Sequence, residues 1–185
     1  MFPQEILEDI FKKILFISDE DFSSRVCDSP FGRYPTHSSD ILMVCKTWLR
    51  IATPLLYECV VLRTRAQAEA FYNAVKDKKT GDVLISSVRR IRLEDHFGLS
   101  TKQVFKSLPN LSELFITTPA ARDETIKSSF PGFRHVNPKR VILDMTEEEL
   151  YFKSHRIFAT LLEEAIKESW NELVRESIFL SVSLS

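Results

Sequence analysis

Residues 41–57 read ILMVCKTWLRIATPLLY, and this stretch decides the fold of the N-terminal part of the chain. Its apolar residues between positions 41 and 52 recur at steps of three and four, which is typical of an amphipathic helix with one wide apolar face. Residues 38–40, Ser-Ser-Asp, are types preferred at a helix N-cap. Thr53 and Pro54 should end this helix and begin another, because proline is favoured at a first helical position and disfavoured in a helix interior.

A second apolar stripe lies upstream, where residues 3–17 predict an amphipathic helix. The intervening residues 18–39 are rich in serine, proline and aspartate. We expect a solvated loop insertion there, because surface loops tolerate added length at little cost.

Together the two helical stretches resemble an F-box. Residues 2–11, FPQEILEDIF, are similar to that family's opening Leu-Pro-x-Glu-Ile-Leu-x-x-Ile-Phe. Residues 44–48, VCKTW, resemble its Val-Cys-basic-x-Trp helix, and Leu56-Tyr57 its Leu-Tyr helix. Phe2 stands in place of the usual leucine, and the spacer 18–39 is longer than is typical. The resemblance covers residues 1–62, about a third of the chain.

The resemblance implies docking onto the Skp-type adaptor of an SCF ubiquitin ligase and, through it, onto a cullin. A module of three short helices also cannot bury all of its large apolar side chains, and an exposed apolar patch marks a partner surface. Packing of this patch on the rest of the chain is the alternative. By motif match the adaptor contact would involve Phe2, Pro3, Ile6, Leu7, Ile10, Leu42, Val44, Cys45, Trp48, Leu49, Leu55, Leu56 and Tyr57.

Strand-like and helix-like segments alternate along the rest of the chain. The predicted inward-facing pairs are Val60/Leu62, Ile91/Leu93, Leu114/Ile116 and Val141/Leu143. Their second members are 31, 23 and 27 residues apart (93−62, 116−93, 143−116), near the repeat of about 20–29 residues in leucine-rich repeats. A generic α/β layer is the alternative. Because an F-box is commonly followed by irregular leucine-rich repeats, the predicted fold is α+β: a three-helix F-box-like module in 1–62, then leucine-rich-repeat-like strand/helix units with a parallel sheet in 63–185.

Local signals place the helices of this second part. The stretch 155–175 keeps an apolar stripe that predicts a long helix, and residues 177–185 alternate serine with apolar residues like a strand. That ending indicates either a final strand or a chain cut short. Three residue pairs have the spacing of a capping box: Thr64 with Gln67, Ser100 with Gln103, and Thr146 with Glu149.

Alternation along the strands also defines a second, outward face of the sheet. We interpret this face as the surface that binds a target protein, with a solvated face as the alternative. Its arginines would favour an acidic or phosphorylated segment. The predicted target-binding residues are Arg63, Arg90, Arg92, Phe115, Arg140 and Ile142.

Bulk properties narrow the function classes. The chain of 185 residues is 44% hydrophobic and 28% charged, with a formal net charge of -1, which gives no attraction toward nucleic acid or acidic membranes. No apolar run approaches the roughly 20 residues that span a bilayer. The odd number of cysteines predicts reduced thiols, and so a location in the cytoplasm, the nucleus or both.

Catalytic and metal-binding patterns are missing from the sequence. The four histidines are scattered, and the four glycines form no phosphate loop. Cys45 is interpreted as a buried, inert residue and Glu94-Asp95-His96 as a solvated strand end rather than an acid/base group. We therefore predict a substrate-receptor subunit that is no enzyme and needs no cofactor or metal. The alternatives are an F-box scaffold outside a ubiquitin ligase and a small α/β enzyme with an unrecognised site.

Overall fold

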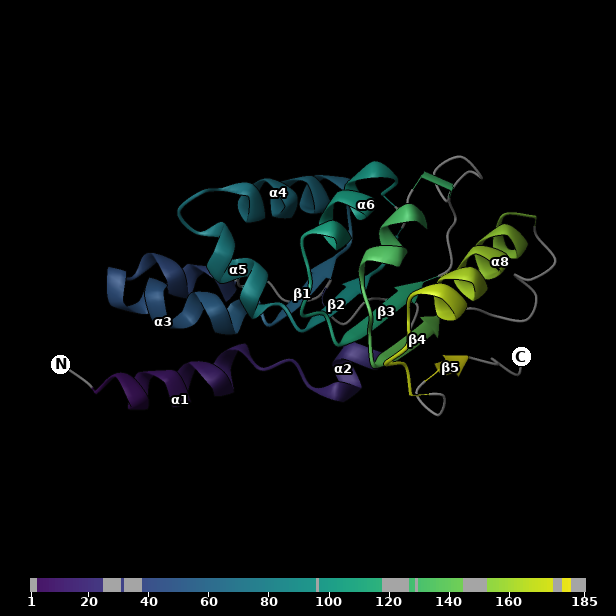
Figure 1. The fold of residues 1–185 in the computed structure, drawn as a ribbon. Coiled ribbons are helices and arrows are strands. Elements are labelled where there is room, and N and C mark those ends of the chain that lie inside the picture. The colour runs from purple at the N-terminus through teal and green to yellow at the C-terminus, as the bar shows by residue number, and fades with distance from the viewer. Residues whose placement is uncertain are drawn as a thin grey trace.

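The fold is α+β, as the sequence predicts: a parallel sheet carries helices on one face, and a separate group of helices lies at one end of it (Figure 1). Phe2, most of the predicted insertion after residue 24, and the predicted capping box at Thr146 lie outside the described residues. The computed structural model describes residues 3–24, 31, 38–95, 97–117, 127–128, 130–144, 153–174 and 178–180.

Five strands pair side by side in the order of the sequence, and every pair is parallel. The register places the first residues of the predicted inward pairs in one row and the second residues in another. All four predicted pairs belong to one buried core, whereas Phe115 and Ile142 between them belong to a second cluster, so the assignment of the two faces is confirmed. The strands are β1 (Cys59–Leu62), β2 (Arg90–Leu93), β3 (Glu113–Thr117), β4 (Arg140–Asp144) and β5 (Ile178–Leu180).

Helices cover one face of the sheet, where their buried side chains form a single core with the inward rows of the strands (Figure 1). Phe133 lies within this core, and its backbone carbonyl accepts a hydrogen bond of 2.9 Å from Nε1 of Trp170. At Gly132 an added Cβ would lie 2.6 Å from the Cα of Lys102, so this close approach requires glycine. The elements of this layer are α4 (Arg65–Lys76), α5 (Gly81–Ser87), α6 (Leu99–Lys106), the 3₁₀ helix η3 (Phe130–His135) and α8 (Lys153–Glu168).

The local signals for these helices were correct only in part. The capping box of Thr64 and Gln67 is confirmed at the start of α4. The box predicted at Ser100 is wrong, because α6 already begins at Leu99 after Gly98, which has a φ of 60° that favours glycine. The predicted final helix extends too far, since α8 ends at Glu168 and the chain then turns Trp170 into the core. Helix α5 was not predicted at all.

The N-terminal unit consists of α1 (Gln4–Leu15), the 3₁₀ helix η2 (Ser38–Met43) and α3 (Lys46–Leu56). Its small core includes Phe11, 1% exposed, whose ring meets Trp48 edge-on at 4.9 Å between centroids. This edge-to-face contact is a preferred arrangement for aromatic pairs.

Two boundaries in this unit differ from the prediction. The helix expected to begin near Ile41 is divided into η2 and α3, and α3 runs through Pro54 instead of ending there. Proline removes the hydrogen bond to the carbonyl four residues earlier, which belongs to the exposed Arg50, and its ring crowds that carbonyl. The following turn still packs Leu55 on the core of the unit, which offsets that loss.

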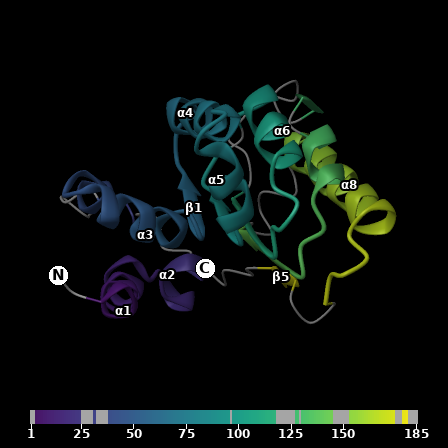
Figure 2. The same ribbon diagram turned by 60° about the vertical axis from the view of Figure 1, so that its left-hand side comes forward.

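The start of the predicted solvated insertion is instead folded. Residues Asp19–Ser23 form the short helix α2, and its Phe22 is 0% exposed. This helix lies on the face of the sheet opposite the helical layer, as two views show (Figures 1 and 2). The prediction of a solvated loop is therefore wrong for this segment, which covers the second face of the sheet.

Candidate functional site

The first candidate surface is apolar and belongs to the N-terminal unit. Ile6 and Ile10 are 47% and 43% exposed on successive turns of α1, and Ile14 continues their stripe. On the neighbouring elements Val44 is 60% and Leu49 46% exposed. Such residues are costly to leave in water, and their concentration on one small unit indicates a protein-contact surface.

The structure divides the predicted adaptor-binding residues into two groups. Pro3, Ile6, Ile10, Val44, Cys45 and Leu49 are exposed, while Phe2 lies outside the described residues. The others face inward or are half-buried: Leu7, Leu42, Trp48 and Leu55 belong to the core of the unit, Leu56 is half-buried, and Tyr57 stacks on Phe71 of α4. The inward group thus makes contacts within the chain, and the exposed group is the part that the structure leaves available to another protein.

The two described cysteines have opposite environments. Cys45 was interpreted as buried, and this is wrong: it is exposed, because it is the N-cap residue that precedes α3 rather than part of an apolar helix face. Cys59 packs beneath α2 beside Phe22 and Phe115. Burial raises the pKa of the Cys59 thiol to about 12, although the charge of Arg90 acts to lower it.

This contrast predicts selective alkylation by iodoacetamide. The thiolate is the reacting form, and at pH 8 the thiol of Cys59 should be about one part in ten thousand ionised. Cys45 should therefore be modified first, and the rate at Cys59 should rise about tenfold for each pH unit below its pKa. Peptide mass spectrometry after timed labelling measures both rates. Equal rates at the two cysteines at pH 8 would contradict the burial of Cys59.

The second candidate surface is the other face of the sheet, and it is not open. We call residues 17–24, which include α2, the strap. Beneath the strap Arg92, Phe115 and Ile142 are 2%, 0% and 1% exposed. The sequence correctly predicted that these residues share one face, but the expectation that they are available to solvent is wrong.

Aromatic and cationic groups alternate under the strap. The ring of Phe22 lies 4.1 Å from the guanidinium of Arg90 and 6.3 Å from the ring of Phe115. The guanidinium of Arg92 lies 3.7 Å from the ring of Phe115, and its Nη1 donates to the carbonyl of Phe22 at 2.6 Å. Arginine above an aromatic face is a favourable cation–π geometry, and it is stronger when water is excluded.

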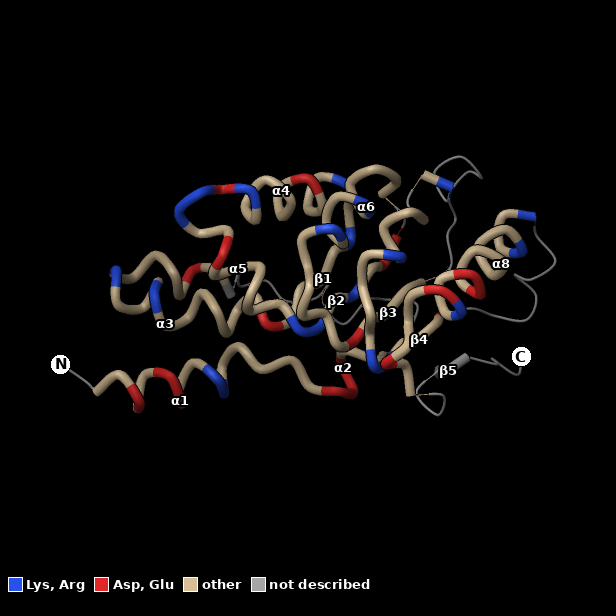
Figure 3. The backbone as a smooth tube through the Cα atoms, viewed as in Figure 1, with Lys and Arg blue, Asp and Glu red and all other residues tan. Residues whose placement is uncertain are grey.

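The strap also places its acidic start against the basic row of the sheet (Figure 3). The two carboxylate oxygens of Asp19 lie 2.6 Å from Nη2 of Arg90 and 3.1 Å from Nη1 of Arg140. Glu113 is 3.3 Å from each of the same arginines. Four charges thus form one network across three strands, β2, β3 and β4, and the strap.

The end of β2 carries a second network. Glu94 accepts from Arg63 at 3.1 Å and from Arg92 at 2.7 Å, so it is not the solvated residue that the sequence suggested. Of the six predicted target-binding residues, Arg63 alone is exposed. The predicted target-binding residues therefore share one face of the sheet, and the strap covers that face.

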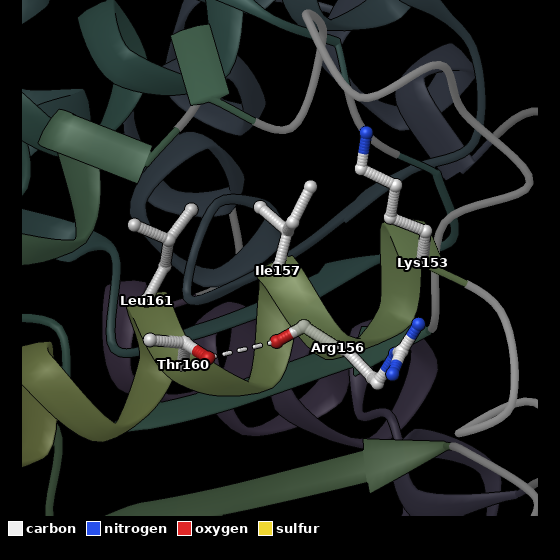
Figure 4. Close-up of a pocket in the computed structure, with 5 residues that line it drawn as sticks. All are labelled: Lys153, Arg156, Ile157, Thr160 and Leu161. Carbon is white, nitrogen blue, oxygen red and sulfur yellow. Dashed lines mark hydrogen bonds between the residues drawn. The ribbon is translucent and has the colours of Figure 1, made fainter.

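One of the pockets in the described part of the chain lies along a single helix. This groove on α8 has a volume of about 390 Å³, and the described side chains that line it come from this one helix (Figure 4). Its Thr160 hydroxyl donates at 3.0 Å to the carbonyl of Arg156 within the helix, as the close-up shows. Among the described residues, no three histidine, cysteine, aspartate or glutamate side chains are grouped for a metal ion. None of the described helices has the length and apolarity to cross a membrane.

Comparisons with protein-family models, with curated proteins and with solved structures gave no match to this chain.

Proposed function

We propose that this protein is the substrate-receptor subunit of an SCF-type ubiquitin ligase, acting in the cytoplasm or nucleus. The N-terminal unit would bind the Skp-type adaptor. The parallel sheet and its helical layer, which we call the sheet domain, would hold the target protein. Such a subunit catalyses no step itself. It raises the effective concentration of the target lysine near the ubiquitin-charged enzyme.

The exposed apolar stripe of α1 is the observation that carries this proposal. Ile6 and Ile10 belong to the stretch that resembles the start of an F-box, and they remain about half exposed although a small core lies directly beneath them. Full burial of an isoleucine side chain contributes about 1.5–3 kcal/mol, so covering these half-exposed residues should contribute roughly 1 kcal/mol each. A partner that covers the stripe therefore gains affinity without refolding the unit.

The second part of the proposal concerns the repeats. We assign the strand and helix units to a leucine-rich-repeat-like array, supported by strands that follow one another in sequence order in a parallel sheet. The pattern Leu108-x-x-Leu111-x-x-Leu114-x-Ile116 supports the same assignment, since these four residues are all buried. Stacked repeats form extended surfaces suited to binding another protein.

Affinity purification of the tagged full chain from cells, followed by mass identification, tests this function. We expect the Skp-type adaptor and a cullin together. A variant with Ile6→Asp and Ile10→Asp, recovered in equal amount, should lose both. Recovery of the adaptor without a cullin would contradict the ligase role and favour a scaffold, and recovery of neither would contradict the whole proposal.

A further inference from the structure

The strap occupies a site with two parts. One part is a pair of arginines, Arg90 and Arg140, which hold the two oxygens of one carboxylate at 2.6 and 3.1 Å. The other is an aromatic slot in which Phe22 lies between Arg90, Phe115 and Ile142 and is completely buried. Asp19 and Phe22 supply both groups from one helical turn.

The remaining contacts use backbone atoms, which any polypeptide has. Nη1 of Arg90 donates at 3.0 Å to the carbonyl of Ile17, and Nη1 of Arg92 donates at 2.6 Å to the carbonyl of Phe22. The features that this site recognises are therefore few: a carboxylate, an aromatic ring three residues later, and two carbonyls. Another protein with the same short pattern could make every one of these contacts.

The composition of the face indicates recognition rather than stability. Arg92 is 2% exposed and the side chain of Arg90 is 13% exposed, so both charged groups are largely removed from water. Replacing buried ion pairs by well-packed apolar residues is often neutral or stabilising, so a strap kept only for stability would not require arginines. The strap also leaves Nε of Arg90 buried without a hydrogen bond, 3.3 Å from Glu113. Its fit to the arginines is incomplete.

The strap is also weakly anchored in comparison with the strands below it. Its helix has five residues, whereas isolated helices are marginal below about 12–15 residues. One side chain, Phe22, is buried, and the side chain of Asp19 is 68% exposed, so water screens its ion pairs. Elements with few buried contacts open before the core does.

From these contacts we infer that the strap is a pseudoligand in the same chain, and that the site binds a helical turn of a target protein with Asp or Glu three residues before an aromatic residue. The target displaces the strap, so the free receptor is closed and target affinity is set by this competition. This inference rests on the proposed role of the sheet domain in target capture. It does not depend on which adaptor the N-terminal unit binds.

A peptide of residues 15–24, LFISDEDFSS, labelled with a fluorophore, is the probe. We compare the full chain with an opened variant, Asp19→Ala with Phe22→Ala, by fluorescence anisotropy. The peptide should bind the opened variant at least tenfold more tightly than the wild-type chain, in which the strap competes at high effective concentration. Binding should weaken with salt, and it should be lost for a peptide carrying the same two alanines and for an opened variant with Arg140→Glu.

Adaptor binding by the same variants separates the two proposals, since it should be unchanged in all of them. Failure of a folded opened variant to bind the peptide would overturn the inference and leave the proposed function standing. If the opened variant does not fold, hydrogen exchange of the wild-type chain tests whether the strap opens. The amide of Phe22, bonded to the carbonyl of Ser18 at 2.9 Å, should exchange at least tenfold faster than those of β3. Equal protection would make the strap a fixed part of the core and would overturn the inference.

Discussion

Replacing Ile6 and Ile10 by aspartate in α1 is expected to weaken binding of a Skp-type adaptor by about 100-fold or more, since each 1.4 kcal/mol is a factor of ten. Both side chains are about half buried in the free chain, so the unfolding free energy should fall by about 1 kcal/mol for each, which a folded unit can tolerate. In the complex, however, each carboxylate would be taken out of water against an apolar partner. Titration calorimetry with the purified adaptor measures the loss.

Matched controls exist on the sheet domain. Val83 on α5 is 47% exposed and Leu99 on α6 is 63% exposed, so Val83→Asp and Leu99→Asp introduce the same carboxylate at positions as exposed as Ile6 or more so. Both control variants should bind the adaptor as the wild-type chain does. If they weaken binding as much as the α1 variant, or if the α1 variant binds normally, the stripe is not the docking surface.

Phe11→Ala should be the most destabilising single change in the N-terminal unit. Phe11 is 1% exposed and makes the edge-on contact with Trp48, so truncation leaves a cavity in a core with few other members. Phe-to-Ala substitutions in cores cost about 3–5 kcal/mol. Urea unfolding followed by circular dichroism should show this loss, and adaptor binding should fall with it because the unit no longer holds α1 in place.

Phe16→Ala is the control for that change. Phe16 lies five residues further along the chain but is 71% exposed, so its removal should cost no more than about 0.5 kcal/mol. A similar cost at both positions would contradict the packing described for the unit.

The sheet could be predicted from the sequence because each strand is marked by a short apolar segment, and such segments recur along the chain. Strand β2 alternates arginine with apolar residues, whereas β3 and β4 are apolar at three consecutive positions. Pairing in register places Val60, Ile91, Leu114 and Val141 in one row. The same alternation correctly grouped Arg90, Arg92 and Phe115 on the other face. The two-residue period of side chains along a strand thus predicted which residues share a face, in agreement with the structure.

The strap could not be predicted in this way. Phe22 is a single apolar residue within the polar stretch SDEDFSS, so no period exists there to indicate burial. Its environment is decided by Phe115, 93 residues away (115−22). The serines and aspartates were assigned to a loop, whereas Ser18 accepts a hydrogen bond from the amide of Asp21 as the N-cap of α2. The contact of Phe22 with the sheet, and not the local sequence, therefore determines that this segment forms a capped helix instead of a loop.

The sequence also could not predict which of the proposed adaptor-binding residues are exposed and which face inward. The apolar stripe of a wide amphipathic face does not say which of its members meet their own chain and which meet a partner. Leu7 and Ile6 are neighbours in sequence, yet Leu7 is 7% and Ile6 47% exposed, because α3 packs against one side of the stripe. Cys45 was misplaced for a related reason, since the periodic pattern continued across the break between η2 and α3.

The central claim is that the exposed stripe of the N-terminal unit binds a Skp-type adaptor. The most direct measurement is titration calorimetry of the purified full chain with the purified adaptor at two or more temperatures. A 1:1 complex whose binding enthalpy becomes more negative with temperature is the predicted result, because burial of apolar surface gives a negative heat-capacity change. Absence of binding at adaptor concentrations of about 100 μM, with the chain folded, would contradict the claim, since that corresponds to less than about 5.5 kcal/mol of binding free energy.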